Sequence, residues 1–417
     1  MTPRMGFPTA RRDTKLQSAA TQPSPASLRF QGPMALVALG HGATHWLLGT
    51  FFILLPFVTR EFGLTYTQAG VLVFVLQVTS FMSTIVGGAA VDMSGRRGVF
   101  LVGCLLLGGA AMLGVGFTNF YAGLIPLVAL IAVSISVWHS PAIAYLSSRY
   151  PAQRGYALSI HSTGASLGDM VAPGMAGLLL TWLTWHQTAL AASVPAFAFA
   201  LAILLLLPAQ GAAAAGTRQG MSIARYFQGL REMTRRLGLL GMCLMVALRG
   251  MAQSGLTMFL PLYLADVLKV SPGMVGGTIL AMHLGAVVMS PVAGIASDRI
   301  GRRPVVMAGL MATTLIIFAL TFVSDTALFV GGVSLLGFSL YSIRAVMQSW
   351  MIDLFPPELS GTATSIFFAM QAGFSATMPL IGGLIADAFG LFEVFYLIAG
   401  VMFASNLMIF LIPRTVR

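Results

Sequence analysis

Long apolar stretches, separated by short polar ones, follow one another from residue 34 to residue 412. Each is long enough to cross the hydrocarbon core of a membrane as a helix, which takes roughly 20 residues. The pattern predicts an all-α integral membrane protein with twelve transmembrane helices. We place them at 34–58, 67–91, 99–117, 121–146, 156–182, 187–208, 239–265, 272–297, 304–323, 326–352, 361–387 and 391–412.

A glycine-rich, basic segment follows the second apolar stretch and recurs in the second half of the chain. The copies, 87–97 and 293–303, are offset by 206 residues. The matching pairs are Gly88 and Gly294, Asp92 and Asp298, Gly95 and Gly301, Arg96 and Arg302, and Arg97 and Arg303. A repeat of half the chain predicts two pseudo-symmetric six-helix halves.

The same offset continues outside the segment, where Gly155, Ser159, Pro173 and Gly177 fall on Gly361, Ser365, Pro379 and Gly383. We therefore divide the chain into a disordered cytoplasmic tail (1–33), an N-terminal half (34–208), a cytoplasmic linker (209–238) and a C-terminal half (239–417). The apolar run after the tail is too long for a secretory signal.

Composition and charge agree with a membrane protein. Hydrophobic residues make up 57% of the chain and charged ones 8%, against about 25% in soluble domains. The net charge of +11 is a topology signal and does not indicate nucleic-acid binding. With the amino-terminus inside, nineteen Lys and Arg residues face the cytoplasm and two, Arg60 and Lys269, face outward. We expect both termini in the cytoplasm, and the bacterial inner membrane as the location.

The repeated pattern G-x-x-x-D-x-x-G-R-R, between the second and third apolar stretches of each half, resembles the signature of the major facilitator superfamily. The resemblance covers residues 34 to 412. It implies a transporter that works by alternating access, with helices 1, 4, 7 and 10 lining a central cavity. We expect Asp92 and Asp298 to brace a cytoplasmic gate by reaching helix N-termini in the opposite half, near Gly361 and Gly155.

Ionisable side chains inside a membrane are energetically expensive and are therefore candidate functional residues. The chain places these at membrane depth: His41, His45, His139, His161, Asp169, Arg249, His283 and Arg344. The resemblance implies that five of them lie on cavity helices: His41, His45, His139, Arg249 and Arg344. The predicted substrate-binding residues are His41, His45, Trp138, His139, Arg249 and Arg344. For Arg249 and Arg344, the alternative to binding a substrate anion is an internal ion pair, with Asp169 as the main available carboxylate.

Spacing adds detail to this set. His41 and His45 are four residues apart and share one helical face. His139 precedes Ser140-Pro141, a context that predicts a weakened helix with free carbonyl groups. Either feature also suits a packing histidine or a simple kink.

The fifth stretch contains Gly164 and Gly168, which form a small face for close helix packing. It resembles the superfamily's antiporter motif, but departs from it by carrying Asp169 and Ala-Pro-Gly. Burial favours the neutral form of Asp169, which we expect to be a proton carrier. His161 is a second proton-coupling candidate. It lies about 80° around the helix and about 12 Å along it from Asp169, too far for contact.

A further resemblance, over about forty residues that include His139-Ser140-Pro141 and 155–168, is to the fosmidomycin-resistance subgroup. The function we predict is proton-coupled efflux of a small organic or amphiphilic compound. The alternative is proton-coupled uptake of a small organic anion held by Arg249 and Arg344. We expect a monomer that is not an enzyme and binds no cofactor. The two cysteines, both in apolar runs, suggest no metal site.

Overall fold

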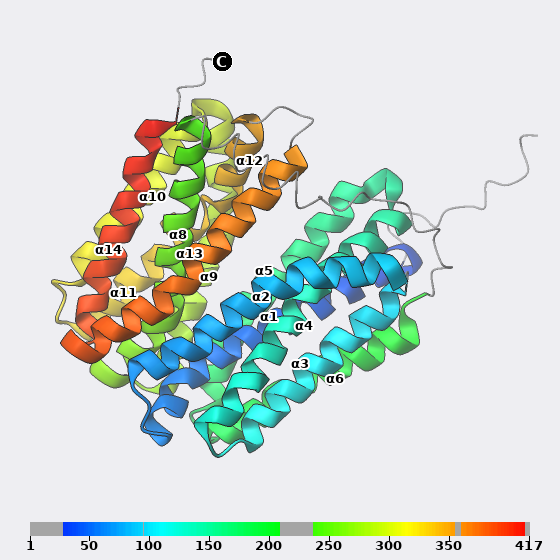
Figure 1. Ribbon diagram of the computed structural model, residues 1–417, viewed down its shortest axis with the longest axis horizontal. Helices are drawn as coiled ribbons and strands as arrows, with labels where there is room; N and C mark the ends of the chain where they lie inside the picture. Colours follow the sequence, from blue (N-terminus) through cyan, green and yellow to red (C-terminus); the bar gives the residue numbers. More distant parts are fainter. Residues whose placement is uncertain (1–27, 95, 209–236, 355–359, 413–417) are drawn as a thin grey trace, which may run out of the picture.

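A computed structural model of the chain describes residues 28–94, 96–208, 237–354 and 360–412, and the regular structure in these ranges is helical. Figure 1 shows two helical bundles. The first contains α1 (Leu28–Glu61), α2 (Tyr66–Ser94), α3 (Arg97–Phe117), α4 (Tyr121–Arg149), α5 (Arg154–Leu179) and α6 (Trp185–Leu206). The second contains α8 (Leu237–Leu262), α9 (Pro272–Ile300), α10 (Arg302–Leu320), α11 (Thr326–Leu336), α12 (Arg344–Leu354), α13 (Ser360–Phe389) and α14 (Leu391–Leu407).

Each predicted span has a helical counterpart, which confirms the fold class. Eleven helices are long and apolar enough to cross a membrane, with α11 and α12 counted as one span. The remaining span is α5, whose polar residues include His161 and Asp169. The predicted tail and linker lie largely outside the described residues.

Pro141 does not end its helix, because α4 is helical throughout Tyr121–Arg149, and the freed carbonyl groups stay a prediction. A proline removes one backbone hydrogen bond, and neighbouring helices can hold a membrane helix together around it. The interruption occurs instead in the second bundle. There a π-helical segment, η3 (Gly337–Tyr341), separates α11 from α12. A second one, η2 (Tyr263–Val267), extends α8.

Close packing of α1 on α5 places the candidate site. A Cβ atom on Gly164 would collide with the carbonyl oxygen of Ala38, and one on Gly168 with that of Gly42. Only glycine allows this approach, so the predicted small face of α5 is confirmed. Because the backbones nearly touch, side chains on α1 reach directly across to those on α5.

The two halves contact each other at one end of the molecule, which we call the closed end. There Gly70 of α2 packs on the carbonyl group of Pro379 of α13, and Gly276 of α9 packs on that of Pro173 of α5. Gly70 and Gly276 are 206 residues apart, as are Pro173 and Pro379. The sequence repeat therefore reappears as two equivalent inter-half contacts.

The opposite end, where α3, α5 and α10 begin, we call the open end. In Figure 1 the two bundles diverge toward this end. Among the residues that the structure describes, none comes within 4 Å of a Cβ atom built on Gly155, at the start of α5, and the same holds for Gly294 of α9. The arrangement is a V whose apex is the closed end.

Candidate functional site

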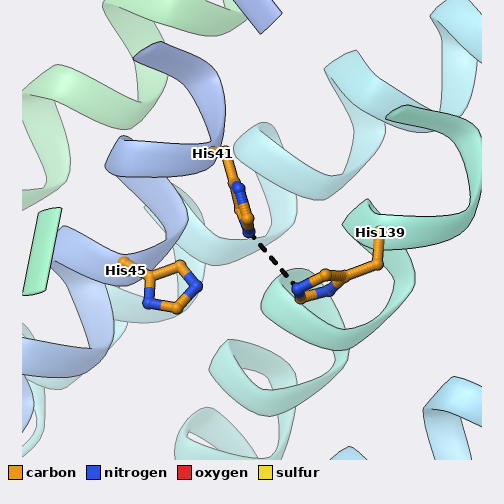
Figure 2. A group of neighbouring side chains, drawn as sticks. All are labelled: His41, His45 and His139. Atoms are coloured by element: carbon orange, nitrogen blue, oxygen red, sulfur yellow. Dashed lines mark hydrogen bonds between the residues drawn. The ribbon is translucent and has the colours of Figure 1, made fainter. Parts of the chain in front are cut away.

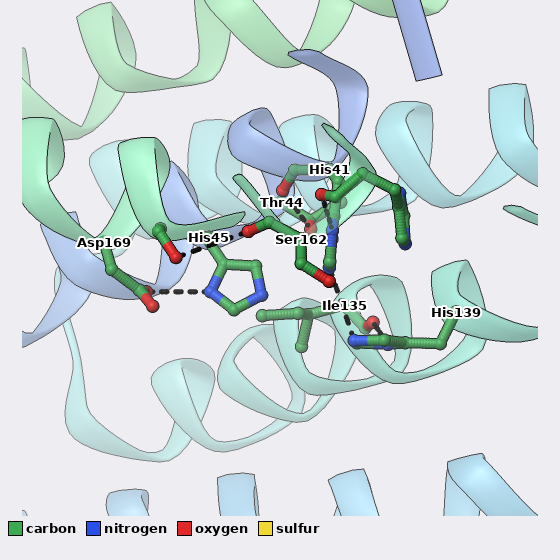
Figure 3. A network of polar contacts seen from close by, with 9 residues as sticks. His41, Thr44, His45, Ile135, His139, Ser162 and Asp169 are labelled. Carbon is green, nitrogen blue, oxygen red and sulfur yellow. Dashed lines mark hydrogen bonds and ion pairs between the residues drawn. The ribbon is translucent and has the colours of Figure 1, made fainter. Parts of the chain in front are cut away.

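Four histidines and one carboxylate from α1, α4 and α5 form a single group in the first half. Figure 3 shows His41, His45, His139 and Asp169 of this group. The imidazole of His41 stacks on that of His161, with ring centroids 4.0 Å apart. His45 and His139 approach the same ring edge-on, at 4.8 and 4.9 Å. Residues separated by 120 positions in the sequence thus lie in contact.

Backbone carbonyl groups orient two of these rings. His41 Nδ1 lies 3.0 Å from the carbonyl oxygen of His161, and His139 Nδ1 lies 2.9 Å from that of Ile135. A carbonyl oxygen can only accept a hydrogen bond, so both Nδ1 atoms carry a proton. The two Nε2 atoms then face each other at 3.3 Å (Figure 2).

His45 pairs with Asp169 across the α1–α5 contact. Its Nδ1 atom lies 2.8 Å from the carboxylate, and the side chains are 17% and 36% exposed respectively. The Asp169 carboxylate is therefore reachable from outside the bundle, although it sits in a membrane-spanning helix. The sequence argument separated Asp169 from His161 correctly, and the structure supplies His45 as its partner.

Trp138 and His161 do not line an open surface. Trp138 is fully buried and packs behind His41, with ring centroids 6.4 Å apart. His161 is 4% exposed, and neither of its ring nitrogens has a hydrogen-bond partner among the described residues. Both residues support His41 and have no surface available to a substrate in this conformation.

The two membrane arginines differ in environment. Arg249 is 2% exposed and donates to the Leu340 carbonyl group, in the π-helical segment η3, and to the Gln253 side chain. Arg344 begins α12 and is exposed. Its charge acts on both Asp169 and His139 across the gap between the halves. Of the two, Arg344 is exposed, whereas Arg249 ties α8 to η3.

His283 of α9 lies next to Tyr341, with ring centroids 5.0 Å apart. It also interacts electrostatically with Asp169. The second half therefore presents His283 and Arg344 toward the histidine group of the first.

The repeated gate motif stabilises turns within each half. Arg97 donates to Ala144 and Ser148 of α4, and its counterpart Arg303 donates to the carbonyl group of Ile412. Gly301 has φ of 95°, a conformation that favours glycine. Arg96 is exposed, and Gly88 lies near Ser140.

The structure gives Asp298 a partner within its own half. Arg302 forms ion pairs with both Asp298 and Asp353. The side chain of Asp92 and the whole of Gly95 lie outside the described residues. Bracing in a conformation closed at this end stays a prediction.

The sequence argument missed three polar contacts near the closed end. Arg60 pairs with Asp266 at 3.0 Å, and Glu61 accepts from both Trp185 and His186. Asp387 of α13 accepts from the backbone N–H groups of Tyr66 and Thr67, at the N-terminus of α2. A signal was present, because a carboxylate at the C-terminal end of its own helix is locally unfavourable.

The family follows from comparison with known proteins. The model of the Major Facilitator Superfamily matches residues 37–283 and 242–417. The chain belongs to this superfamily. It is 23% identical to the "Multidrug efflux pump Tap" of Mycolicibacterium fortuitum over 92% of this chain and 96% of that one. It is 21% identical to the "Fosmidomycin resistance protein" of Escherichia coli (strain K12) over 94% of this chain and 95% of that one.

Solved transporter structures share the fold. A bacterial homologue of the human lysosomal transporter Spinster, solved in an inward-facing and occupied conformation, superposes with a TM-score of 0.77 at 13% identity. The match covers 94% of this chain and 98% of that one. This protein is therefore a multi-pass membrane transporter of the superfamily, consistent with secondary active transport.

Proposed function

We propose that the protein is a secondary transporter that works by alternating access and exports a small organic or amphiphilic compound in exchange for protons. The observation that carries the proposal is the group of His41, His45, His139, His161 and Asp169 in the membrane. Buried titratable groups are rare in membrane helices and mark proton and substrate pathways. Relatives named as an efflux pump and a resistance protein support the export direction.

The conformation supports alternating access. The positive-inside distribution of arginines supports an open end on the cytoplasmic side, with both termini there. The structure then corresponds to an inward-facing state, like that of the Spinster homologue. We place the protein in a bacterial inner membrane, acting as a monomer.

The proposed substrate region combines charge and apolar surface. Arg344 and the histidine group supply polar contacts. A hollow of about 480 Å³ between α8 and α13 is lined mainly by apolar side chains, among them Met251, Met370 and Phe374. Methionine side chains adapt to ligands of different shape. These features suit an amphiphilic compound.

For coupling, we propose that the Asp169–His45 pair takes up and releases the proton. Asp169 is partly exposed while its partner is buried more deeply, so a proton reaches the carboxylate from the open side. Loss of the negative charge weakens the pair across α1 and α5. A proton carrier must alternate between such paired and unpaired states.

The test uses proteoliposomes with an imposed proton gradient of either sign and two probes, anionic fosmidomycin and cationic ethidium. We expect Asp169→Asn to abolish gradient-driven flux while substrate exchange persists, because Asn mimics the protonated state permanently. Asp325→Asn is the control, since Asp325 only caps the N-terminus of α11. Persistent coupled flux in Asp169→Asn, with loss in His41→Gln and His45→Gln, would move the proton site to α1.

The second candidate function is proton-coupled uptake of a small organic anion. The exposure of Arg344 favours it, because this side chain makes no ion pair with any described residue. The same assay separates the two functions. In antiport, protons that move down their gradient drive the substrate in the opposite direction. In symport, protons and substrate cross the membrane in the same direction.

A further inference from the structure

The Nε2 atoms of His41 and His139 form a contact that ordinary hydrogen bonding does not satisfy. Both Nδ1 protons are committed to backbone carbonyl groups. Each neutral ring therefore presents only a lone pair at Nε2. Two such acceptors at 3.3 Å repel each other unless a cation lies between them.

A third imidazole faces the same point. His45 donates its Nδ1 proton to Asp169, and its Nε2 atom is buried without a hydrogen-bond partner among the described residues. In Figure 3 the ring nitrogen opposite Asp169 points toward His41 and His139. One nitrogen from each of the three rings lies within 4.8 Å of the other two.

We propose that His41, His45 and His139 bind one divalent transition-metal ion through their Nε2 atoms. Zinc–nitrogen bonds of about 2.0–2.1 Å in a tetrahedral site separate neighbouring nitrogens by roughly 3.3–3.4 Å. The His41–His139 spacing already has this value. The His45 ring moves toward His41 and His139 to bring its Nε2 atom to this spacing, while its Nδ1 atom keeps the hydrogen bond to Asp169.

The surroundings of the three rings match those of metal ligands in proteins. A ligating histidine usually donates its second ring N–H to a carboxylate or a backbone carbonyl group, which fixes the ring and raises its basicity. Here all three do so: His45 donates to the Asp169 carboxylate, His41 to the carbonyl group of His161 and His139 to that of Ile135. His41 and His45 are also spaced i, i+4 on one helix, which puts two ligands on one face.

The donor set selects the metal class. Imidazole nitrogen suits zinc, copper, nickel and cobalt, whereas magnesium and calcium prefer oxygen ligands. Three protein ligands leave one tetrahedral position for water or for a donor atom of a transported compound. Asp169 supplies negative charge beside the site, while the positive charge of Arg344 acts on it from the second half and opposes the metal charge.

The metal site stands on this geometry alone and does not depend on the direction or coupling of transport. Its test is binding of Zn²⁺ and Co²⁺ to the purified full-length protein in detergent, without any gradient. Calorimetry measures the Zn²⁺ stoichiometry and affinity, and visible absorption reports tetrahedral Co²⁺. A failed transport assay leaves this measurement unaffected, and the reverse also holds.

We expect one Zn²⁺ per chain, competition by Co²⁺ and none by Mg²⁺. His41→Gln and His139→Gln should each weaken binding at least 100-fold. Asp169→Asn, which removes the carboxylate that supports His45 and its negative charge beside the site, should weaken it about 10- to 100-fold. Arg344→Gln should tighten it by removing an opposing charge. His186→Gln, a histidine outside the group, is the matched control and should bind as the wild type does.

Two results would overturn the proposal. Wild-type protein that takes up no stoichiometric Zn²⁺ would leave a shared proton as the cation between His41 and His139. Zn²⁺ binding that survives both His41→Gln and His139→Gln would place the metal elsewhere. The first result needs only the wild-type chain, so it can refute the proposal even if a variant misfolds. Wild-type thermal stability with and without Zn²⁺ gives a second readout.

Discussion

Asp387 holds the closed end together by capping a helix of the opposite half. Its two carboxylate oxygens accept from the backbone N–H groups of Tyr66 and Thr67, at 2.7 and 2.9 Å. These donors belong to the first turn of α2, where the helix dipole also favours a negative charge. We predict that Asp387→Asn opens the closed end.

The size of the effect follows from these contacts. Asparagine keeps one acceptor oxygen but loses the charge and one of the two hydrogen bonds. A hydrogen bond to a charged group contributes about 1.5–3 kcal/mol, and a charge at a helix N-terminus about 0.3–1 kcal/mol. Asp387 is exposed, so water replaces part of this. A net loss of about 1–2 kcal/mol shifts the closed-to-open ratio roughly 5- to 30-fold.

The assay is a distance measurement between spin labels at Phe120 and Phe322, which lie near this end in different halves and are exposed. The native cysteines, Cys104 and Cys243, are buried and are replaced by serine first. The longer-distance population should grow in Asp387→Asn. Asp325→Asn is the matched control, because Asp325 caps the N-terminus of α11 within its own half.

Two outcomes would refute the reasoning. An unchanged distance distribution in Asp387→Asn would mean that the cap contributes nothing to closure. An equal shift in Asp325→Asn would mean that loss of any helix cap loosens the bundles, regardless of which half the helix belongs to.

The remaining predictions concern packing, charge and the open end. Gly276→Ala should open the closed end, because the new methyl group meets the Pro173 carbonyl oxygen and overpacking costs about 1–3 kcal/mol. Gly277→Ala is the control, because its methyl group would meet no described atom within 4 Å. The same spin labels measure both variants. Arg344→Lys should reduce transport of an anionic probe, and full activity would exclude bidentate recognition. Asp298→Asn should shift the balance toward opening at the Arg302 end, and unchanged transport together with unchanged distances there would rule out the bracing role.

The fold could be predicted almost completely from the sequence, because membrane helices are dictated by length and apolarity. Interruptions within helices were harder to predict. Proline at 141 attracted the prediction of weakening, whereas the π-helical segment lies at Gly337–Tyr341. There a Cβ atom on Gly337 would collide with the Met282 carbonyl group, so the distortion accompanies a close approach of α9. Such an approach depends on tertiary packing and leaves no local pattern in the sequence.

The candidate site was predicted residue by residue but not as a group. Burial cost alone singled out His41, His45, His139 and Asp169. What local sequence could not provide was the pairing of His45 with Asp169 across 124 positions, or the opposed Nε2 atoms of His41 and His139. Both contacts depend on how closely α5 packs against α1 at Gly164 and Gly168. The glycines were recognised as packing residues, but the register between the helices is set by the three-dimensional fit.

The pseudo-symmetry of the chain explains why closure depends on few polar groups. Backbone packing at the closed end is duplicated, with Gly70 on Pro379 and Gly276 on Pro173. The polar contacts are not duplicated. Arg60 and Asp266 are equivalent positions, 206 residues apart, and they meet each other, so the repeat has diverged there into opposite charges.

Asp387 shows the same divergence on one side of the interface. Subtracting the offset of 206 from 387 gives Thr181, a neutral residue whose methyl group faces Gly273 at the start of α9. The α2–α13 contact therefore has a charged cap, and the equivalent α5–α9 contact relies on glycine packing. The glycine packing of the two contacts is alike, so Asp387 gives the α2–α13 contact a stabilising free energy that the α5–α9 contact lacks. Opening should accordingly begin on the α5–α9 side, next to the helix that carries Asp169 and His161.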